Sequence, residues 1–335
     1  MSVTDDLRML AVGGSTTECF YLDQEEAWPQ RVQQILNENG TYGHVWVGNI
    51  GRSATDVPVH YVQLKYLLPQ IDKIDLIVFL VGVNDMTAFL RHKPPYKSIS
   101  PYDPAIENRL LYKAFSSVEF LRPWCQKTGF WQIAKGLKHN IYFPLLGINE
   151  IEDPSGFIIR NRREKRMRAR EFLDSLPSAQ TSLDDYRYGI QQCIQLVRAY
   201  GAEMIFMTQP TIWSDSMNKT LNKFLWFGWT YDCKNQEYCS YYSTKAIAQA
   251  MASYNAILLA TCKDMGVPCL DLANLLPKDT TIFFDDMHFN ENGSQQVAIH
   301  LADFIKDSLM IKSAVKKSNC HTVKLINCEQ YVVNN

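Results

Sequence analysis

The segment Arg8–Phe20, with the sequence RMLAVGGSTTECF, decides the fold and raises the first question about function. An apolar run typical of a buried strand ends abruptly at Gly13 and Gly14, and a serine follows. Glycine tolerates a positive φ, so the pair favours a sharp turn. Two interpretations of Ser15 are open at this point. The residue either caps a following helix or displays a hydroxyl group at the end of a strand.

Four more short runs have a similar composition. Most are continuously apolar rather than alternating, which indicates strands covered on both faces and hence a parallel sheet. Helical patterns lie between them, over residues 25–40, 186–201, 243–266 and 294–310. This alternation predicts an α/β fold with a three-layer, doubly wound, flavodoxin-like sheet of about five parallel strands. The predicted strands cover residues 9–14, 44–50, 76–82, 203–209 and 267–272.

We expect a single domain over residues 8–310. Residues 87–185 and 211–243 interrupt the alternation with more chain than a crossover helix requires. Both segments leave from the carboxyl end of a predicted strand, where sheets of this class bind ligands. We therefore interpret them as insertions that build a lid or a substrate wall at this rim. Residues 312–335 are expected to form a C-terminal tail or an added edge strand.

The composition is that of an ordinary globular protein, with 46% hydrophobic residues and a net charge of −1. Such a balance gives no reason to expect nucleic-acid binding. No segment approaches the roughly 20 apolar residues that span a bilayer, and the first residues lack the apolar core of a signal peptide. Two expectations follow. The protein is cytoplasmic if the chain is complete, and it is secreted or associated with a membrane or cell envelope if a leader was trimmed. Nothing in the sequence favours one oligomeric state.

The nine cysteines include no CxxC pair, so the spacing of a zinc site is absent. Cys233 and Cys239 lie close together in the sequence, as do Cys320 and Cys328. Each pair fits a small disulfide loop in an oxidising compartment. Free thiols fit the same residues equally well.

Candidate site residues lie next to three more of the predicted elements. Asn49 and Gly51 end the second strand, Asn84 follows the third, and Asp285 and His288 lie in a loop before the last helix. Each signal alone fits an ordinary turn or cap. Together they fall on the rim to which Ser15 belongs. A carboxylate beside an imidazole fixes its tautomer, and an amide N–H can stabilise a developing oxyanion.

In this order the signals resemble the motifs of the SGNH (GDSL-type) hydrolase family, in particular its carbohydrate-esterase-like members. The four matching blocks are GGST (13–16), NIG (49–51), GVND (82–85) and DDMH (285–288). One departure is that the aspartate usual before the nucleophile is Gly14 here. Support for Ser15 must then come from elsewhere, and Glu18 is the nearest candidate.

The resemblance implies ester hydrolysis by a catalytic triad, with no metal or organic cofactor. Ser15 would be the nucleophile, His288 its general base and Asp285 the group that orients His288. The spacing Asp-x-x-His makes Asp286 the weaker candidate for that last role. The oxyanion hole would consist of the backbone N–H groups of Ser15 and Gly51 and the side-chain amide of Asn84.

Each insertion carries one unusual stretch. Residues 160–172, RNRREKRMRAREF, hold seven basic and two acidic side chains. They predict either a basic face for an acidic polysaccharide or membrane, or a solvated helix that pairs with acids elsewhere. Residues 224–233, FLWFGWTYDC, are rich in aromatic side chains. Trp226, Trp229 and Tyr231 are candidates for stacking on a sugar or packing an acyl chain, or they anchor the loop to its own small core.

Three functions remain as hypotheses. The first is an esterase that removes acetyl or other short acyl groups from a carbohydrate. The second is an O-acetyltransferase acting on a cell-envelope polysaccharide, which would use the same triad with a sugar hydroxyl in place of water. The third is a glycan-binding module without turnover. The substrate in each case is a small-molecule or carbohydrate ester or glycan.

Overall fold

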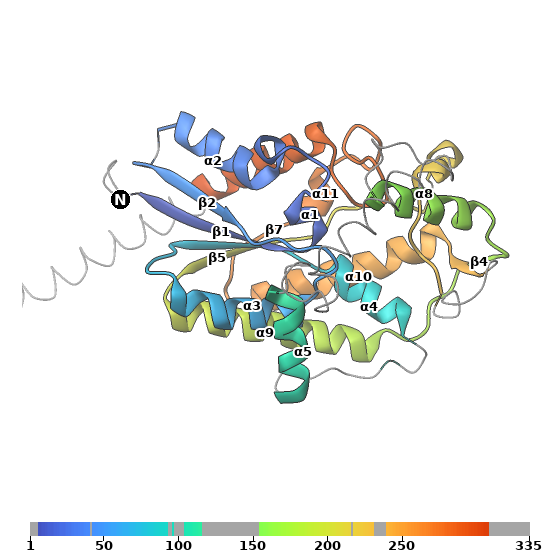
Figure 1. Ribbon diagram of the computed structural model, residues 1–335, viewed down its shortest axis with the longest axis horizontal. Coiled ribbons are helices and arrows are strands. Elements are labelled where there is room, and N and C mark those ends of the chain that lie inside the picture. Colours follow the sequence, from blue (N-terminus) through green and yellow to red (C-terminus); the bar gives the residue numbers. More distant parts are fainter. Residues whose placement is uncertain are drawn as a thin grey trace, which may run out of the picture.

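A five-stranded parallel sheet forms the centre of the protein in the computed structural model (Figure 1). The structure describes residues 6–40, 42–92, 96, 104–115, 154–215, 217–230 and 239–307. The strand order is β2-β1-β3-β5-β7. In chain order these strands are β1 (Leu7–Gly13), β2 (Val45–Asn49), β3 (Leu76–Leu80), β5 (Glu203–Met207) and β7 (Cys269–Leu270). The predicted α/β fold with about five parallel strands is confirmed.

The strands are apolar on both faces because helices cover both. All five residues of β3 are buried, and only Arg8 of β1 is exposed. Phe79 of β3 and Phe206 of β5 are register neighbours, and their rings stack with centroids 4.4 Å apart. This continuous burial explains why the strands read as unbroken apolar runs in the sequence.

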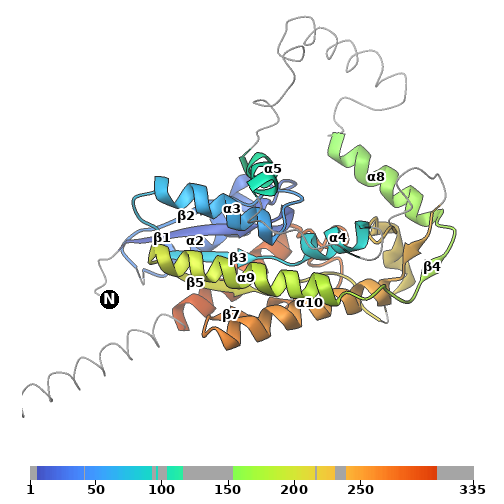
Figure 2. The same cartoon turned by 90° about the horizontal axis from the view of Figure 1, so that it is seen from below.

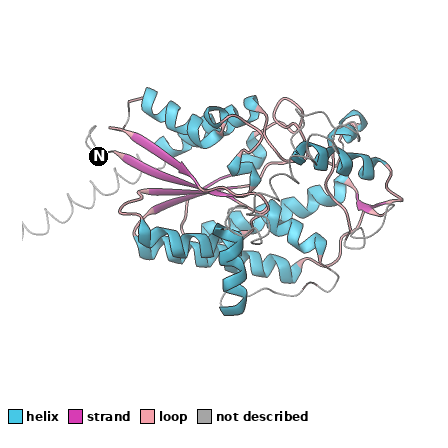
Figure 3. Cartoon of the chain, viewed as in Figure 1, coloured by secondary structure: helices cyan, strands magenta, loops and turns pink. Residues whose placement is uncertain are grey.

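Helices lie on the two faces of the sheet (Figures 1 and 3). One face carries α2 (Trp28–Glu38) and the helical residues 291–307, while the other carries α3 (Val57–Leu67), α9 (Gln180–Tyr200) and α10 (Thr244–Asp264). Short elements complete this part of the chain: α1 (Ser15–Glu18), η1 (Gln24–Glu26), η2 (Leu68–Gln70) and α11 (Leu272–Leu275). The result is the predicted layered arrangement of helix, sheet and helix.

Most elements of the two predicted insertions lie beyond the carboxyl ends of the strands, whereas the helix over residues 104–115 packs against α3 (Figures 1 and 2). From the first come most of α4 (Val83–Arg91), α5 (Pro104–Phe115), α8 (Pro154–Met167) and β4 (Phe172–Leu173), and from the second η5 (Lys219–Phe224) and β6 (Tyr241–Tyr242). Strands β4 and β6 pair in parallel, so the two insertions are joined by a small sheet of their own. Residues 312–335 lie outside the described residues.

The cysteines are partly described. Cys239 is disulfide-bonded, whereas Cys19, Cys193, Cys262 and Cys269 are free thiols. Cys233, Cys320 and Cys328 fall outside the described residues. In the described ranges, no helix is both long enough and apolar enough to cross a membrane.

Replacing the aromatic stack between β3 and β5 tests the central packing. We expect Phe206→Ala to lower the free energy of unfolding by about 3–5 kcal/mol, because the change removes a fully buried ring and leaves a cavity. The measurement is the midpoint of urea unfolding followed by fluorescence and circular dichroism. Trp46→Ala on edge strand β2 is the control, since that ring is 45% exposed. Equal destabilisation by both changes would contradict the assignment of Phe206 to the core.

Candidate active site

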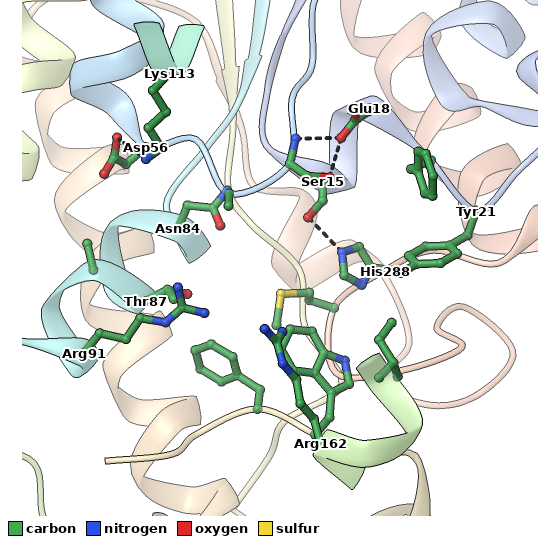
Figure 4. A pocket seen from close by; sticks show the side chains of 18 residues that line it. Ser15, Glu18, Tyr21, Asp56, Asn84, Thr87, Arg91, Lys113, Arg162 and His288 are labelled. Carbon is green, nitrogen blue, oxygen red and sulfur yellow. Dashed lines mark hydrogen bonds and ion pairs between the residues drawn. The ribbon is translucent and has the colours of Figure 1, made fainter. Parts of the chain in front are cut away.

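Ser15, His288 and Asp285 form one hydrogen-bonded chain at the carboxyl ends of the strands. Figure 4 shows its contact between Ser15 and His288. Ser15 is the first residue of α1, directly after β1. Its Oγ lies 2.8 Å from Nε2 of His288, and Nδ1 of His288 lies 2.7 Å from Oδ2 of Asp285. The structure thus brings together the three residues predicted as nucleophile, base and orienting acid, although 273 positions separate Ser15 from His288.

Asp285 is held by more than the histidine. Its Oδ1 accepts hydrogen bonds from the backbone N–H groups of Met287 and His288, and its Oδ2 also accepts one from the indole N–H of Trp226. The carboxylate is fully buried. Every one of these donors favours its ionised form and fixes its orientation. Asp285 is therefore a rigid, charged acceptor for the Nδ1–H of His288.

Asp286 points to different partners. Its carboxylate accepts hydrogen bonds from the indole N–H of Trp213 and from the backbone N–H groups of Trp226 and Phe227. Burial and the neighbouring charge of Asp285 raise the pKa of Asp286 to about 6. None of these hydrogen bonds involves the imidazole of His288, which contacts Asp285 instead. Asp286 therefore holds the aromatic segment in place.

The His288 ring is fixed by packing as well as by hydrogen bonds. Phe284 stacks near one face with a centroid distance of 5.6 Å, and Trp226 lies nearly parallel at 6.4 Å. Burial favours the neutral imidazole, but the charge and hydrogen bond of Asp285 outweigh it, so the pKa of His288 is raised above its ordinary 6.5. A base with a pKa above 6.5 and a hydroxyl 2.8 Å away suits proton abstraction near neutral pH.

Gly13 and Gly14 are required by close packing rather than by a positive φ. A Cβ on Gly14 would lie 2.1 Å from Nδ2 of Asn84, and one on Gly13 would lie 2.4 Å from the carbonyl oxygen of Leu80. The φ of Gly14 is −82°, within the range of any residue. The expected reason for the glycine pair, a left-handed turn, is therefore wrong. The missing side chain at position 14 is what lets the amide of Asn84 approach Ser15.

Asn84 stands at the start of α4, immediately beyond the end of β3. Its Nδ2 donates to the carbonyl oxygen of Thr55 over 2.8 Å. An amide nitrogen carries two hydrogens, so a second donor remains for a ligand. The backbone N–H of Ser15, in the first turn of α1, likewise has no acceptor within the part of the chain that is described. Both donors flank the Ser15 hydroxyl.

Gly51 does not supply the third donor expected of it. Its backbone N–H donates to Oδ1 of Asn49 over 2.9 Å, and Gly51 is not among the residues that line the cavity. A Cβ at this position would lie 2.4 Å from the backbone nitrogen of Glu18, so glycine allows the end of β2 to pack against α1. This assignment from the sequence is corrected.

Ala54, three residues further on, lines the cavity instead. It has a φ of +60°, rare for a residue with a side chain. In the described ranges its backbone N–H has no acceptor. Backbone held in such a conformation often marks a functional site. Ala54 was not predicted from the sequence, because alanine is not a residue type that predicts a left-handed backbone conformation.

Glu18 supports the site through a loop, not through the nucleophile. Its carboxylate accepts hydrogen bonds from the backbone N–H of Ser53, over 2.6 Å, and from the Ser53 hydroxyl. No hydrogen bond joins Glu18 to the Ser15 hydroxyl, whose partner is His288. Glu18, the nearest candidate to support Ser15, therefore fixes the loop that presents Ala54.

A cavity of about 530 Å³ opens beside the three residues (Figure 4). Trp226 lines it, but its indole N–H is bound to Asp285, so this candidate for substrate stacking also serves as a partner of the triad. Trp229 stacks on Trp226 at 5.8 Å. Tyr231 falls outside the described residues. Two cavity-lining residues that the sequence did not single out are Arg91 and Arg162, although Arg162 belongs to the basic stretch noted there.

No group of three or more His, Cys, Asp or Glu side chains suited to a metal occurs in the described ranges. The site is built instead from a hydroxyl, an imidazole, a carboxylate and amide donors. This set of groups can remove a proton from Ser15, stabilise the resulting histidinium and hold a negatively charged oxygen. These are the groups that acyl transfer requires.

Comparisons with known proteins concern the fold. No protein-family model matches the chain, and no curated protein sequence does. Over about nine-tenths of its length, the structure matches solved G-D-S-L lipolytic proteins and acetyl xylan esterases. At 10–13% sequence identity these matches say nothing about the substrate.

Three of these structures illustrate the sequence identities, TM-scores and coverages of the matches. The acetyl xylan esterase AlAXEase shares 13% identity and a TM-score of 0.45, covering 88% of this chain and 98% of its own. A G-D-S-L lipolytic protein from Veillonella parvula DSM 2008 has 10% identity, a TM-score of 0.44 and coverages of 89% and 97%. The acetylxylan esterase Axe2 from Geobacillus stearothermophilus has 12% identity, a TM-score of 0.43 and coverages of 91% and 94%.

Proposed function

We propose that the protein is a serine ester hydrolase that removes acetyl or other short acyl groups from a carbohydrate. The observation that carries this proposal is the continuous chain from Ser15 Oγ to His288 Nε2, and from His288 Nδ1 to the Asp285 carboxylate. The carbohydrate part rests on the resemblance of the four motifs to the carbohydrate-esterase-like members of the SGNH family, and it is the part that substrate tests must decide.

The proposed reaction begins when His288 takes the proton of Ser15 and the Ser15 oxygen attacks the ester carbonyl. The carbonyl oxygen becomes negatively charged in the tetrahedral intermediate. The N–H of Ser15, the amide of Asn84 and the N–H of Ala54 are the proposed donors to that oxygen, with Ala54 in the place first given to Gly51. Each such donor typically contributes ~10²–10³-fold in kcat.

Collapse of the intermediate breaks the ester bond. His288 returns the proton to the departing alcohol, and the acyl group remains on Ser15. A water molecule then attacks the acyl-enzyme, with His288 again as the base, and the free acid leaves. Asp285 stays ionised throughout, because burial alone would raise the pKa of this carboxyl but His288 and the backbone donors hold it below its usual range.

Loss of the nucleophile or the base should abolish turnover. We expect Ser15→Ala and His288→Ala each to lower kcat for p-nitrophenyl acetate by about 10⁴-fold or more, and the double variant to lose no more than either alone, since the residues act as a unit. Initial rates of p-nitrophenolate release measure this. Ser253→Ala and His44→Ala, both at exposed positions, serve as controls. Turnover that survives Ser15→Ala would contradict the proposal.

The packing of Gly14 against Asn84 gives a second prediction. We expect Gly14→Ala to lower kcat by ~10²–10³-fold, because the new methyl group displaces the amide donor. Asn84→Ala should cost a similar factor. The double variant Gly14→Ala/Asn84→Ala should be only slightly worse than Asn84→Ala, since both changes remove the same donor. Fully multiplicative losses in this double-mutant cycle would show that Gly14 acts in another way.

The pH dependence of kcat/KM tests the role of Asp285. Activity requires neutral His288, whose pKa is raised above 6.5, so kcat/KM should rise with pH through a midpoint above that value. In Asp285→Asn the favourable charge is gone and burial dominates. The midpoint should then move to lower pH while the plateau falls by roughly 10²–10⁴-fold. A midpoint that stays in place or rises would contradict the assignment of Asp285 as the partner of His288.

A further inference from the structure

Two arginine side chains reach into the cavity beside Ser15 and His288 (Figure 4). Arg91 is the last residue of α4, and Arg162 lies on α8, so they come from different elements of the first insertion. Arg162 is partly exposed, and Arg91, at the end of its helix, is exposed. Neither residue is used by the proposed triad or by the proposed oxyanion donors.

Both guanidinium groups are positioned by the same indole ring. Arg91 lies over Trp229 with its guanidinium carbon 4.6 Å from the ring centroid, and Arg162 lies over the same ring at 5.2 Å. Arg162 is also 5.0 Å from the ring centroid of Trp226. Stacking on aromatic faces restricts a guanidinium group and leaves its N–H donors at the ring edge available.

Neither arginine has a neutralising partner among the residues that the structure describes. Within the described ranges, no ion pair or hydrogen bond joins Arg91 or Arg162 to another side chain or to the backbone. Burial lowers the pKa of both groups, and the charge of Arg162 lowers the pKa of Arg91 further. The effect of Arg162 on Arg91 is that of one positive charge near another.

The other charged groups of the cavity are already engaged. Asp56 forms an ion pair with Lys113 over 3.5 Å, and the carboxylate of Glu18 accepts two hydrogen bonds from Ser53. Glu18 keeps its negative charge, since Ser53 is a neutral donor, but with Asp56 paired to Lys113 the two arginines outnumber it. An excess of positive charge faces the space in which a substrate of Ser15 would lie.

Neighbouring arginines on the same helix show what a purely structural arginine does here. Arg163 donates to the carbonyl oxygens of Phe224 and Phe284 over 3.0 and 3.1 Å. Arg166 is buried and donates to the carbonyl oxygen of Phe227 over 2.7 Å. Both bind α8 to the rest of the chain. Arg162 lines the cavity and makes no such bond to any residue that the structure describes.

We propose that Arg91 and Arg162 form a subsite for an anionic group, so that the ester substrate carries a carboxylate, as a uronic acid does, or a sulfate or phosphate. This inference rests on the proposed ester hydrolysis at Ser15. Guanidinium groups bind such oxyanions through paired N–H donors. The anion would lie in the same cavity as the scissile ester and would neutralise the two charges on binding.

The experiment compares matched acetyl esters that differ in charge. The substrates are mono-O-acetylated methyl glucuronoside, the neutral mono-O-acetylated methyl glucoside, and the 6-sulfate and 6-phosphate of the latter. Released acetate is measured for the wild type, Arg91→Gln, Arg162→Gln and the double variant. Arg168→Gln removes an exposed charge just beyond α8 and is the matched control. Hydrolysis of p-nitrophenyl acetate, which is neutral, reports separately on the proposed function.

The wild type should favour at least one anionic ester over the neutral one by about 10- to 100-fold in kcat/KM. Each arginine variant should reduce that ratio, and the double variant should bring it close to one, while p-nitrophenyl acetate hydrolysis stays within about threefold of wild type, because a neutral ester gains nothing from the charges. Preference for the uronate indicates a carboxylate, and preference for the sulfate or phosphate a tetrahedral anion. Added NaCl should weaken the preference.

Three results would overturn the subsite. One is equal kcat/KM for charged and neutral sugars while p-nitrophenyl acetate is hydrolysed in a Ser15-dependent way, which leaves the esterase intact. Another is an equal loss for all substrates in the arginine variants, which indicates a structural role. If no ester is hydrolysed, titration calorimetry with methyl glucuronoside, methyl glucoside 6-sulfate and methyl glucoside decides, and equal affinities for the three would end the proposal.

Discussion

Two adjacent buried carboxylates join the candidate active site to the insertion that covers it. Asp285 faces His288 and also accepts the indole N–H of Trp226. Asp286 turns the other way and accepts the backbone N–H groups of Trp226 and Phe227. One tryptophan is therefore bound to both acids. The loop that carries the base and the aromatic segment of the second insertion cannot move independently, because a shift of either would leave a buried charge without donors.

The sheet determines where these parts meet. In a parallel sheet the carboxyl ends of all strands lie at one edge. Here β1 leads to Ser15, β2 to the loop that holds Ala54, and β3 to Asn84. The nucleophile and its proposed oxyanion donors thus come from three strands that are neighbours in the sheet order. The base and the orienting acid arrive from a separate loop, which is the one held by the aromatic segment. The segments that follow three adjacent strands carry the oxyanion donors. The packed insertion fixes the orientation of the imidazole through Trp226 and Asp285.

Much of this was predictable because the signals are local. Continuous apolar runs identified the five strands, and the placement of Ser15, Asn84, Asp285 and His288 followed from polar residues just beyond ordered elements. Helix α3 gave no comparable signal, since Val59, His60 and Gln63 are all buried and the helix has no plain polar face. The roles of Gly14 and Gly51 depend on distances to Asn84 and Glu18, residues remote in the sequence, and local propensity carries no such information. The φ of Ala54 is likewise imposed by its surroundings.

The basic stretch of the first insertion shows most clearly why charge in a sequence does not translate into function directly. Its composition left two interpretations, an exposed cationic face or a helix paired with acids. The described arginines follow neither one uniformly: Arg163 and Arg166 donate to backbone carbonyl oxygens, and Arg162 faces the cavity. The position of each arginine around the axis of α8, relative to the aromatic segment, determines whether it bonds to the backbone or faces the cavity. The chain as a whole has a net charge of −1, yet Arg91 and Arg162, both from the first insertion, face the cavity beside Ser15. The local charge at this site is therefore set by the insertion and not by the overall composition.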